Sequence, residues 1–377
     1  MRFSDIPGLH DVKSSLSRAV EGGHVAHAQM FLGDEGSGNL ALAMAMGALL
    51  TCDNPQDGDA CGVCPSCVKN AKLIHPDVHY IFPVSPVGKI TGKDAISTSF
   101  LTEWRKFAVE MPYGNAEDWS FYFGGENKQL NISKEESRNI IRSLTLKSFE
   151  GKYKVMIIWQ PEYLHPNAAN GILKILEEPA EKTVFILVAY DQEKLLGTIK
   201  SRTQTFRIRS FNDEEIAQTL VATKEIDPYK AQQIAHIAAG NLREAYRLSD
   251  DTADDHFNLF RDWMRACFKP NTELLLDQTE GFFKMSKTAQ KSLFQYGLGI
   301  LRECVVLTGS QPILNRLAGE ELEFAQKFNS HINLPIIEKI AMLFDQALYH
   351  IERNANAKIL FLDISYKISA FLKSKQS

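Results

Sequence analysis

Residues 30–67 read MFLGDEGSGNLALAMAMGALLTCDNPQDGDACGVCPSC. Residues 29–32 predict a short buried strand, the glycine-rich segment that follows predicts a loop, and residues 41–50, rich in Ala, Leu and Met, predict a helix. Strand, glycine-rich loop and helix in this order are the context in which a phosphate-binding P-loop occurs. The stretch therefore indicates the first strand and helix of a parallel α/β sheet.

The glycine-rich loop lacks the two residues on which P-loop chemistry depends. The template is G-x-x-x-x-G-K-[ST], and here the last two positions are Asn39 and Leu40. In a working loop the Lys neutralises the β- and γ-phosphates and the hydroxyl binds Mg²⁺, whereas Asn39 is uncharged and Leu40 has no oxygen in its side chain. We therefore expect a degenerate P-loop, in which Gly33, Gly36 and Gly38 only shape the turn.

Four of the six cysteines follow directly: Cys52, Cys61, Cys64 and Cys67. Two overlapping C-x-x-C pairs and one more distant Cys can place four thiolates tetrahedrally around Zn²⁺. An iron–sulfur cluster is the alternative, but its common bacterial spacing has a further Cys-Pro three residues on, whereas Val68 follows the last Cys here. Four Cys ligands leave no open coordination position, so the sequence favours a structural zinc site at 52–67.

Apolar runs at 154–159 and 184–189, an alternating segment at 78–82 and a short segment at 203–208 predict the other strands, with helices between them. Strands that alternate with helices form a parallel, doubly wound sheet. An active NTPase ends one such strand in Asp or Asp-Glu to hold Mg²⁺. The strand at 154–159 instead ends in Trp159 and Gln160, so a second part of the ATPase machinery is also missing.

The pattern from residue 209 onward is helical. We expect an α/β domain at 1–208, containing the zinc module at 52–67 and an insert at about 83–128, a small helical domain at 209–250, and a helical bundle at 251–377. The insert is rich in Pro, Gly and aromatic residues, and we expect its aromatic side chains to form a small core of their own. An exposed aromatic patch there would instead mark a partner surface.

The segment SKEE at 133–136 predicts a capping box that opens a helix. Lys134, Arg138 and Arg142 recur every four residues along this helix and could follow a nucleic-acid backbone through phosphate contacts. The adjacent glutamates favour the alternative, a solvated face with ion pairs along the helix.

The composition is that of a globular protein, with 44% hydrophobic and 23% charged residues and a formal net charge of −4. It does not favour a basic protein that coats nucleic acid. No apolar run reaches the roughly 18 residues that span a bilayer, and the N-terminal residues MRFSDIPG lack a signal-like apolar segment. We expect a cytoplasmic protein, in which clustered cysteines indicate metal binding rather than disulfides.

Taken together, these features resemble the delta-prime family of bacterial DNA polymerase III clamp-loader subunits, which are AAA+ proteins. Besides the degenerate P-loop and its four cysteines, the resemblance rests on AANGILKILEEP at 168–179, Ser201-Arg202, GNLR at 240–243 and IERNANAKI at 351–359. It covers most of the chain except residues 83–128.

The resemblance implies an AAA+ core, a helical lid and a helical collar that assembles a ring with other subunits. It also implies partners: the motor subunits and the delta subunit of the loader, the sliding clamp, and primed DNA in the assembled complex. In this family a Ser-Arg-Cys motif presents its arginine to the ATP of the neighbouring subunit. Arg202 matches that arginine, although Thr203 replaces the Cys, and Arg243 matches the sensor 2 position.

An arginine at the mouth of the sheet can stabilise charge on a transferred phosphoryl group, as arginine fingers do in trans. The alternative for Arg202 is an ordinary surface arginine. We therefore expect a subunit without ATPase activity of its own that supplies Arg202 to a neighbour. Two other functions stay open, namely an ATP-hydrolysing motor subunit of the same loader and a zinc-ribbon nucleic-acid-binding protein. Asn39 and Leu40 argue against the first, and the acidic balance against the second.

Overall fold

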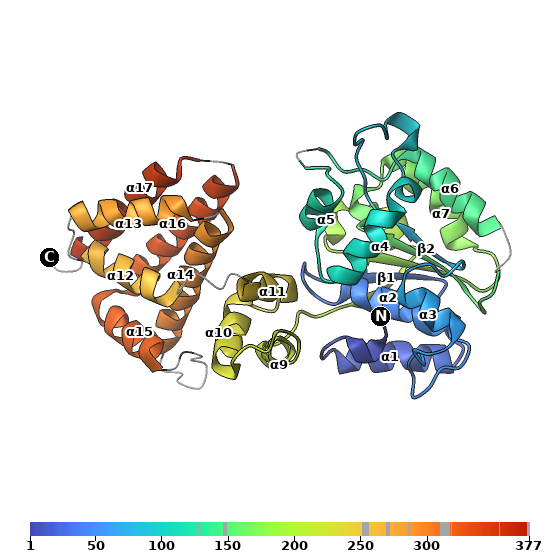
Figure 1. Ribbon diagram of the computed structural model, residues 1–377, viewed down its shortest axis with the longest axis horizontal. Helices are drawn as coiled ribbons and strands as arrows, with labels where there is room; N and C mark the ends of the chain where they lie inside the picture. Colours follow the sequence, from blue (N-terminus) through green and yellow to red (C-terminus); the bar gives the residue numbers. More distant parts are fainter. Residues whose placement is uncertain are drawn as a thin grey trace. The chain divides into compact units, whose positions relative to one another are not determined.

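The computed structural model describes residues 1–126, 128–145, 149–250, 256–268, 272–285, 287–309, 317, 319–353 and 355–374 (Figure 1). The chain divides into two compact units, which are Met1–Pro228 with Ala239–Tyr246, and Tyr229–Ala238 with Arg247–Ser377. Among the described residues, no helix combines the length and the apolar character that crossing a membrane requires.

A five-stranded parallel sheet forms the centre of the first unit, with the strand order β2-β3-β4-β1-β5. Every residue of β1, β3 and β4 is buried, as expected of apolar strands covered on both faces. The predicted parallel α/β sheet is confirmed. The strands are β1 (Ala28–Leu32), β2 (Val78–Ile81), β3 (Lys154–Trp159), β4 (Thr183–Ala189) and β5 (Gln204–Arg207).

Helices cover both faces of this sheet. On one face lies α2 (Asn39–Thr51), which is apolar on all sides and wholly buried between the sheet and its neighbouring helices. On the other face, α6 (Lys134–Thr145) and α7 (Pro166–Glu177) pack side by side and add Ile140 and Ile172 to the core of the sheet (Figure 1). The first unit also contains α1 (His10–Glu21), α3 (Pro65–Ala71) and α8 (Gly197–Lys200).

The insert contains α4 (Leu101–Glu110) and α5 (Ala116–Tyr122), and its aromatic residues do not form a separate core. The ring of Trp104 stacks on Phe82 with 4.2 Å between centroids and lies 5.1 Å from Trp159 at the end of β3. Trp119 completes the cluster from α5. The aromatic side chains of the insert do pack on one another, as predicted. Their core is not separate, however, because it continues onto the large apolar side chains at the ends of β2 and β3.

The capping box predicted at 133–136 is also wrong. Glu136 is buried, and its Oε2 accepts hydrogen bonds from the backbone N (2.6 Å) and the Oγ (3.0 Å) of Ser97. Burial raises the pKa of Glu136 although both bonds oppose that shift. The carboxylate therefore ties α6 to the insert and is no partner for surface cations.

The three basic residues of α6 are exposed. Arg138 pairs with Glu135 at 2.8 Å, as a solvated helix face would. Contact of Lys134, Arg138 or Arg142 with DNA stays a prediction.

From α9 onward the described chain is helical, which confirms the predicted all-helical C-terminal region. The second unit has its own aromatic core, in which Trp263 stacks on Phe344 and Phe361. The predicted boundary at 251 lies outside the described residues, and the division into three domains stays a prediction. The helices are α9 (Asp213–Lys224), α10 (Pro228–Ala238), α11 (Leu242–Asp250), α12 (His256–Phe268), α13 (Thr272–Lys284), α14 (Lys287–Thr308), α15 (Gly319–His331), α16 (Leu334–Glu352) and α17 (Ala357–Ser374).

Candidate functional site

The degenerate P-loop joins β1 to α2, and its Asn39 side chain is fully buried. The Nδ2 of Asn39 donates to the carbonyls of Gly33 (3.0 Å) and Ala189 (3.2 Å), while its Oδ1 accepts from Ser37 Oγ at 2.8 Å. The side chain at the position of the P-loop lysine thus bonds to the loop itself and to the end of β4. It neither carries a charge nor points a free donor toward a phosphate. Leu40 is likewise fully buried.

Residues 239–246 lie against the same loop. The backbone N of Leu242 donates to the carbonyl of Gly36 at 3.0 Å. Gly36 has φ +76°, and a Cβ there would lie 1.8 Å from Asn241 Oδ1. Glycine is therefore required at this position both for the left-handed backbone and for the close approach of Asn241.

Two acidic residues stand in the loop, and both are bonded to neighbouring segments. Asp34 Oδ2 accepts from Ser210 Oγ at 3.1 Å, and Glu35 Oε2 accepts from Asn115 Nδ2 at 2.8 Å. Both residues belong to the loop that would hold a triphosphate, so the Coulomb repulsion of their negative charges opposes nucleotide binding.

Arg243, the residue at the sensor 2 position, pairs with Asp118 of α5. The Nη2 of Arg243 lies 2.6 Å from Asp118 Oδ1, and its Nε donates to Oδ2. The two side chains are only 20% and 15% exposed. Although burial opposes the charge, the hydrogen bond and charge of Asp118 raise the pKa of Arg243 above its ordinary value. The guanidinium is therefore neutralised within the chain by a bidentate carboxylate.

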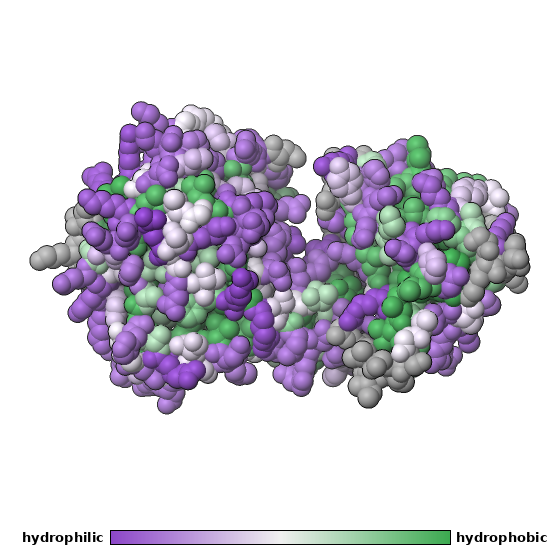
Figure 2. Space-filling view, turned by 180° about the vertical axis from the view of Figure 1, so that it is seen from behind, coloured by the Kyte–Doolittle hydropathy of each residue, from purple (hydrophilic) through white to green (hydrophobic). Residues whose placement is uncertain are grey.

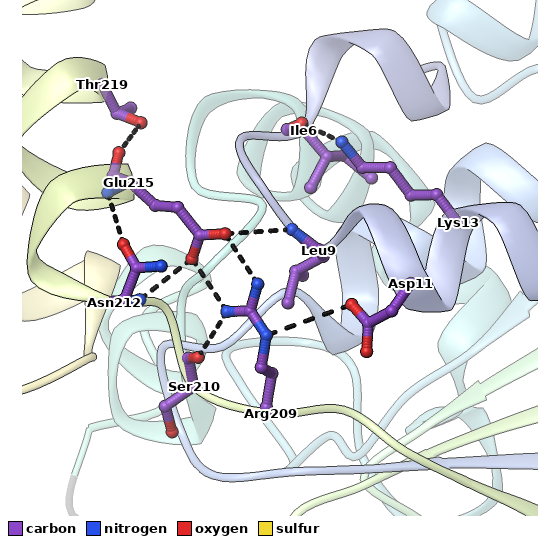
Figure 3. Close-up of polar contacts among 9 residues, drawn as sticks. All are labelled: Ile6, Leu9, Asp11, Lys13, Arg209, Ser210, Asn212, Glu215 and Thr219. Atoms are coloured by element: carbon purple, nitrogen blue, oxygen red, sulfur yellow. Dashed lines mark hydrogen bonds and ion pairs between the residues drawn. The ribbon is translucent and has the colours of Figure 1, made fainter.

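A second polar cluster, centred on Glu215, fixes α9 to the beginning of the chain (Figure 3). Its Oε1 accepts from Arg209 Nη2 (2.7 Å) and from the backbone N of Leu9 (3.3 Å), while its Oε2 accepts from Arg209 Nη1 (2.8 Å) and from the backbone N of Asn212 (2.9 Å). The hydrogen bonds from Arg209 are the main reason why the pKa of Glu215 falls to about 2. The carboxylate is thus ionised at neutral pH and joins three segments of the chain.

Arg202 lies between α8 and β5. Its Nε donates to Glu177 Oε2 at 3.0 Å, and its Nη1 donates to the carbonyl of Thr198 at 3.1 Å. The Arg202 side chain is 30% exposed and that of Glu177 58%. These partners belong to α7 and α8 and not to the P-loop, so the guanidinium is oriented at the surface of the unit by two helices.

The four predicted cysteines come together, with all four Sγ atoms within 4.8 Å of one another. Cys52 follows the end of α2, Cys61 and Cys64 lie in the next loop, and Cys67 belongs to α3. Cys52 and Cys67 are buried, and the other two are partly buried. This arrangement is consistent with a structural zinc site.

Backbone donors surround these sulfur atoms. The N–H groups of Cys61, Cys64 and Cys67 each lie 3.4 Å from the Sγ of the preceding cysteine of the set. Backbone hydrogen bonds from Val63 and Cys64 lower the pKa of Cys61 to about 6, whereas burial raises the pKa of Cys52 and Cys67. A bound cation would favour the thiolate at all four positions.

Three acidic residues of this region, Asp118, Glu177 and Glu215, were not identified from the sequence as site residues. Asn115 and Asp118 carry a local signal, because N-x-x-D at a helix start is typical of a capping box, and both halves of that box are present in α5. No local pattern in the sequence predicts that these two residues pair with Glu35 and Arg243.

Residues 8–212 match the family described as "DNA polymerase III, delta subunit". The tau subunit of DNA polymerase III from Escherichia coli is 25% identical over 253 residues, which make up 66% of this chain and 32% of that protein. The delta' subunit from Bacillus subtilis is 25% identical over 240 residues, or 63% of this chain and 58% of that protein. The matches thus span between 32% and 58% of the length of these two relatives.

Among solved structures, a DNA polymerase III gamma subunit-related protein from Thermotoga maritima aligns over 96% of this chain and 100% of that chain, with 17% identity and a TM-score of 0.40. The relatives include both tau and delta' subunits, so identity alone does not separate these two types.

Proposed function

The chain belongs to the DNA polymerase III delta subunit family, and we propose that it is a delta-prime-type subunit of the clamp loader. It has no ATPase activity of its own and supplies Arg202 to the ATP bound by a neighbouring subunit. It takes part in opening the sliding clamp and placing it on primed DNA, together with the motor and delta subunits.

The hydrogen bonding of the Asn39 side chain is the main support for this proposal. The hydrogen bonds of this side chain go to Gly33 and Ser37 of the P-loop and to Ala189 of β4. The side chain at the lysine position is thus engaged within the chain itself. A motor subunit needs a lysine and a hydroxyl at this end of the loop to neutralise the phosphates and to hold Mg²⁺. The similarity to tau favours the alternative of a motor subunit, but the residues of the loop argue against it.

The geometry of Arg202 supports a role in trans. An arginine finger needs a guanidinium that is held at a surface and can donate hydrogen bonds to a phosphoryl group bound by another subunit. Glu177 accepts from Nε of Arg202 and the carbonyl of Thr198 accepts from its Nη1, and these two contacts fix the direction of the guanidinium.

The helical second unit supports a role in assembly. Large apolar side chains are exposed on it, and Figure 2 shows broad apolar areas on its surface, at the right of that view. Exposed apolar areas of this kind are typical of protein interfaces. The large apolar side chains that are exposed in this unit include Leu276, Phe283, Leu334, Met342 and Ile359.

The four cysteines would hold Zn²⁺ as a structural ion. The ion would join the end of α2 to α3 and to the loop between them, and it would add free energy of folding to this short segment.

Reconstitution tests the assignment. The purified chain is mixed with the delta subunit and a tau- or gamma-type subunit from the same organism, and the products are measured by size-exclusion chromatography with light scattering. We expect one stable complex that contains all three kinds of subunit and that loads the clamp onto primed DNA. A complex that forms and loads clamps equally well without this chain would contradict the proposal.

A further inference from the structure

The insert reaches the P-loop region through residues 113–118. Three contacts in the first unit make this connection. Asn115 binds Glu35 of the P-loop, Asp118 binds Arg243, and the ring of Tyr113 packs edge-on against Phe211 with 5.8 Å between centroids. Tyr113 also lies 6.3 Å from the ring of Tyr246. One short segment of the insert therefore contacts the loop, Phe211 and residues 239–246 together.

The segment 239–246 is in turn bonded directly to the loop. Leu242 N donates to the carbonyl of Gly36, and Asn241 lies against the same glycine. The P-loop, residues 239–246 and residues 113–118 thus form a closed set of contacts, in which each member contacts the other two.

The charged pair in this set of contacts is Arg243 and Asp118. A nucleotide bound to a P-loop would bring negative charge, which a nearby arginine would neutralise. Here the carboxylate of Asp118 supplies that negative charge to Arg243, and it does so from within the chain. Because both side chains are largely buried, removal of either one leaves a charge without its partner.

We propose that residues 113–118 of the insert replace a nucleotide as the element that holds residues 239–246 against the P-loop. The contact is permanent, so the first unit keeps one arrangement whether or not ATP is present. This assignment gives the insert a function in the chain itself and does not depend on the role of Arg202.

Hydrogen–deuterium exchange of the full chain, followed by mass spectrometry, tests the proposal. In the Asp118→Asn variant, peptides covering 33–38, 113–122 and 239–246 are expected to exchange at least about tenfold faster, because the buried pair is broken. Peptides of β3, β4 and the helical second unit keep their rates. The Glu117→Gln variant is the matched control, since it removes the same charge from the exposed neighbouring position of α5.

Three further measurements test the proposal. Exchanging the charges in Asp118→Arg with Arg243→Asp is expected to restore part of the protection. In Glu35→Ala, which changes an exposed residue of the loop, only peptides 33–38 and 113–122 are expected to exchange faster. Mg-ATP is expected to leave the wild-type exchange unchanged.

Two results would overturn the proposal. One is a folded Asp118→Asn variant with wild-type exchange at 33–38 and 239–246. The other is clear protection of 33–38 by Mg-ATP in the wild-type chain. The first result does not bear on hydrolysis by the assembled complex, so it distinguishes a failure of this proposal from a failure of the proposed function. The second result would also contradict the expected lack of nucleotide binding.

Discussion

Replacing Arg202 with Ala is expected to slow ATP hydrolysis at the neighbouring subunit's site by about 10³-fold, the lower end of the range for arginine fingers. The planar guanidinium supplies several donors to the developing charge, and Ala supplies none. The fold is expected to survive, because exposed ion pairs such as Arg202–Glu177 contribute only about 0–1 kcal/mol to stability. The total ATPase rate of the loader is expected to fall by at least the fraction of that rate contributed by the site that receives Arg202.

The measurement is the DNA-stimulated ATPase rate of the reconstituted loader, together with its single-turnover phase. Arg202→Lys keeps the charge but loses the fork geometry and is expected to recover only a small part of the rate. Arg207→Ala is the matched control, since Arg207 is an exposed arginine of β5 close by in the sequence. Equal rates for wild type and Arg202→Ala, in complexes of the same composition, would remove the role in trans.

Replacing Cys67 with Ala is expected to abolish zinc binding and to lower the thermal midpoint of the first unit by roughly 10 °C or more, since structural zinc contributes several kcal/mol to folding. Cys67 is buried beside Cys52, so the loss reaches the end of α2, which packs on the sheet. Elemental analysis of the wild-type chain is expected to give one zinc per chain, and a strong chelator is expected to reproduce the effect of the substitution.

Cys304→Ala is the control for this experiment, because Cys304 is equally buried but lies in the second unit. It is expected to keep the zinc content of the wild-type chain. A wild-type protein that is fully folded without metal would contradict the zinc site. Iron with visible absorption bands would show that the alternative of an iron–sulfur cluster was correct.

The elements that the sequence predicted well are those with a strong local signal. The strands β1, β3 and β4 are mostly apolar, with Gln29 the one polar residue inside a strand, and their burial on both faces follows from that pattern. The four cysteines are close in sequence, so their spacing alone predicts that they meet. The loss of the P-loop lysine is likewise visible at a single position, Asn39.

The contacts that were missed join residues far apart in the chain. Asp118 and Arg243 are separated by 125 positions, and Glu35 and Asn115 by 80. Glu136 shows the same limit, because its place in S-x-x-E indicated a local cap, whereas the folded chain brings Ser97 to it. Tertiary contacts of this kind override a local pattern when they satisfy a buried charge better.

We propose that this chain keeps the fold of an ATPase but has no nucleotide chemistry of its own. Equilibrium dialysis of the isolated full chain against labelled Mg-ATP, with a hydrolysis assay on the same samples, is the decisive measurement. We expect neither binding nor turnover at ATP concentrations that saturate a tau-type subunit measured in parallel. Tight binding with turnover by the isolated chain would contradict it.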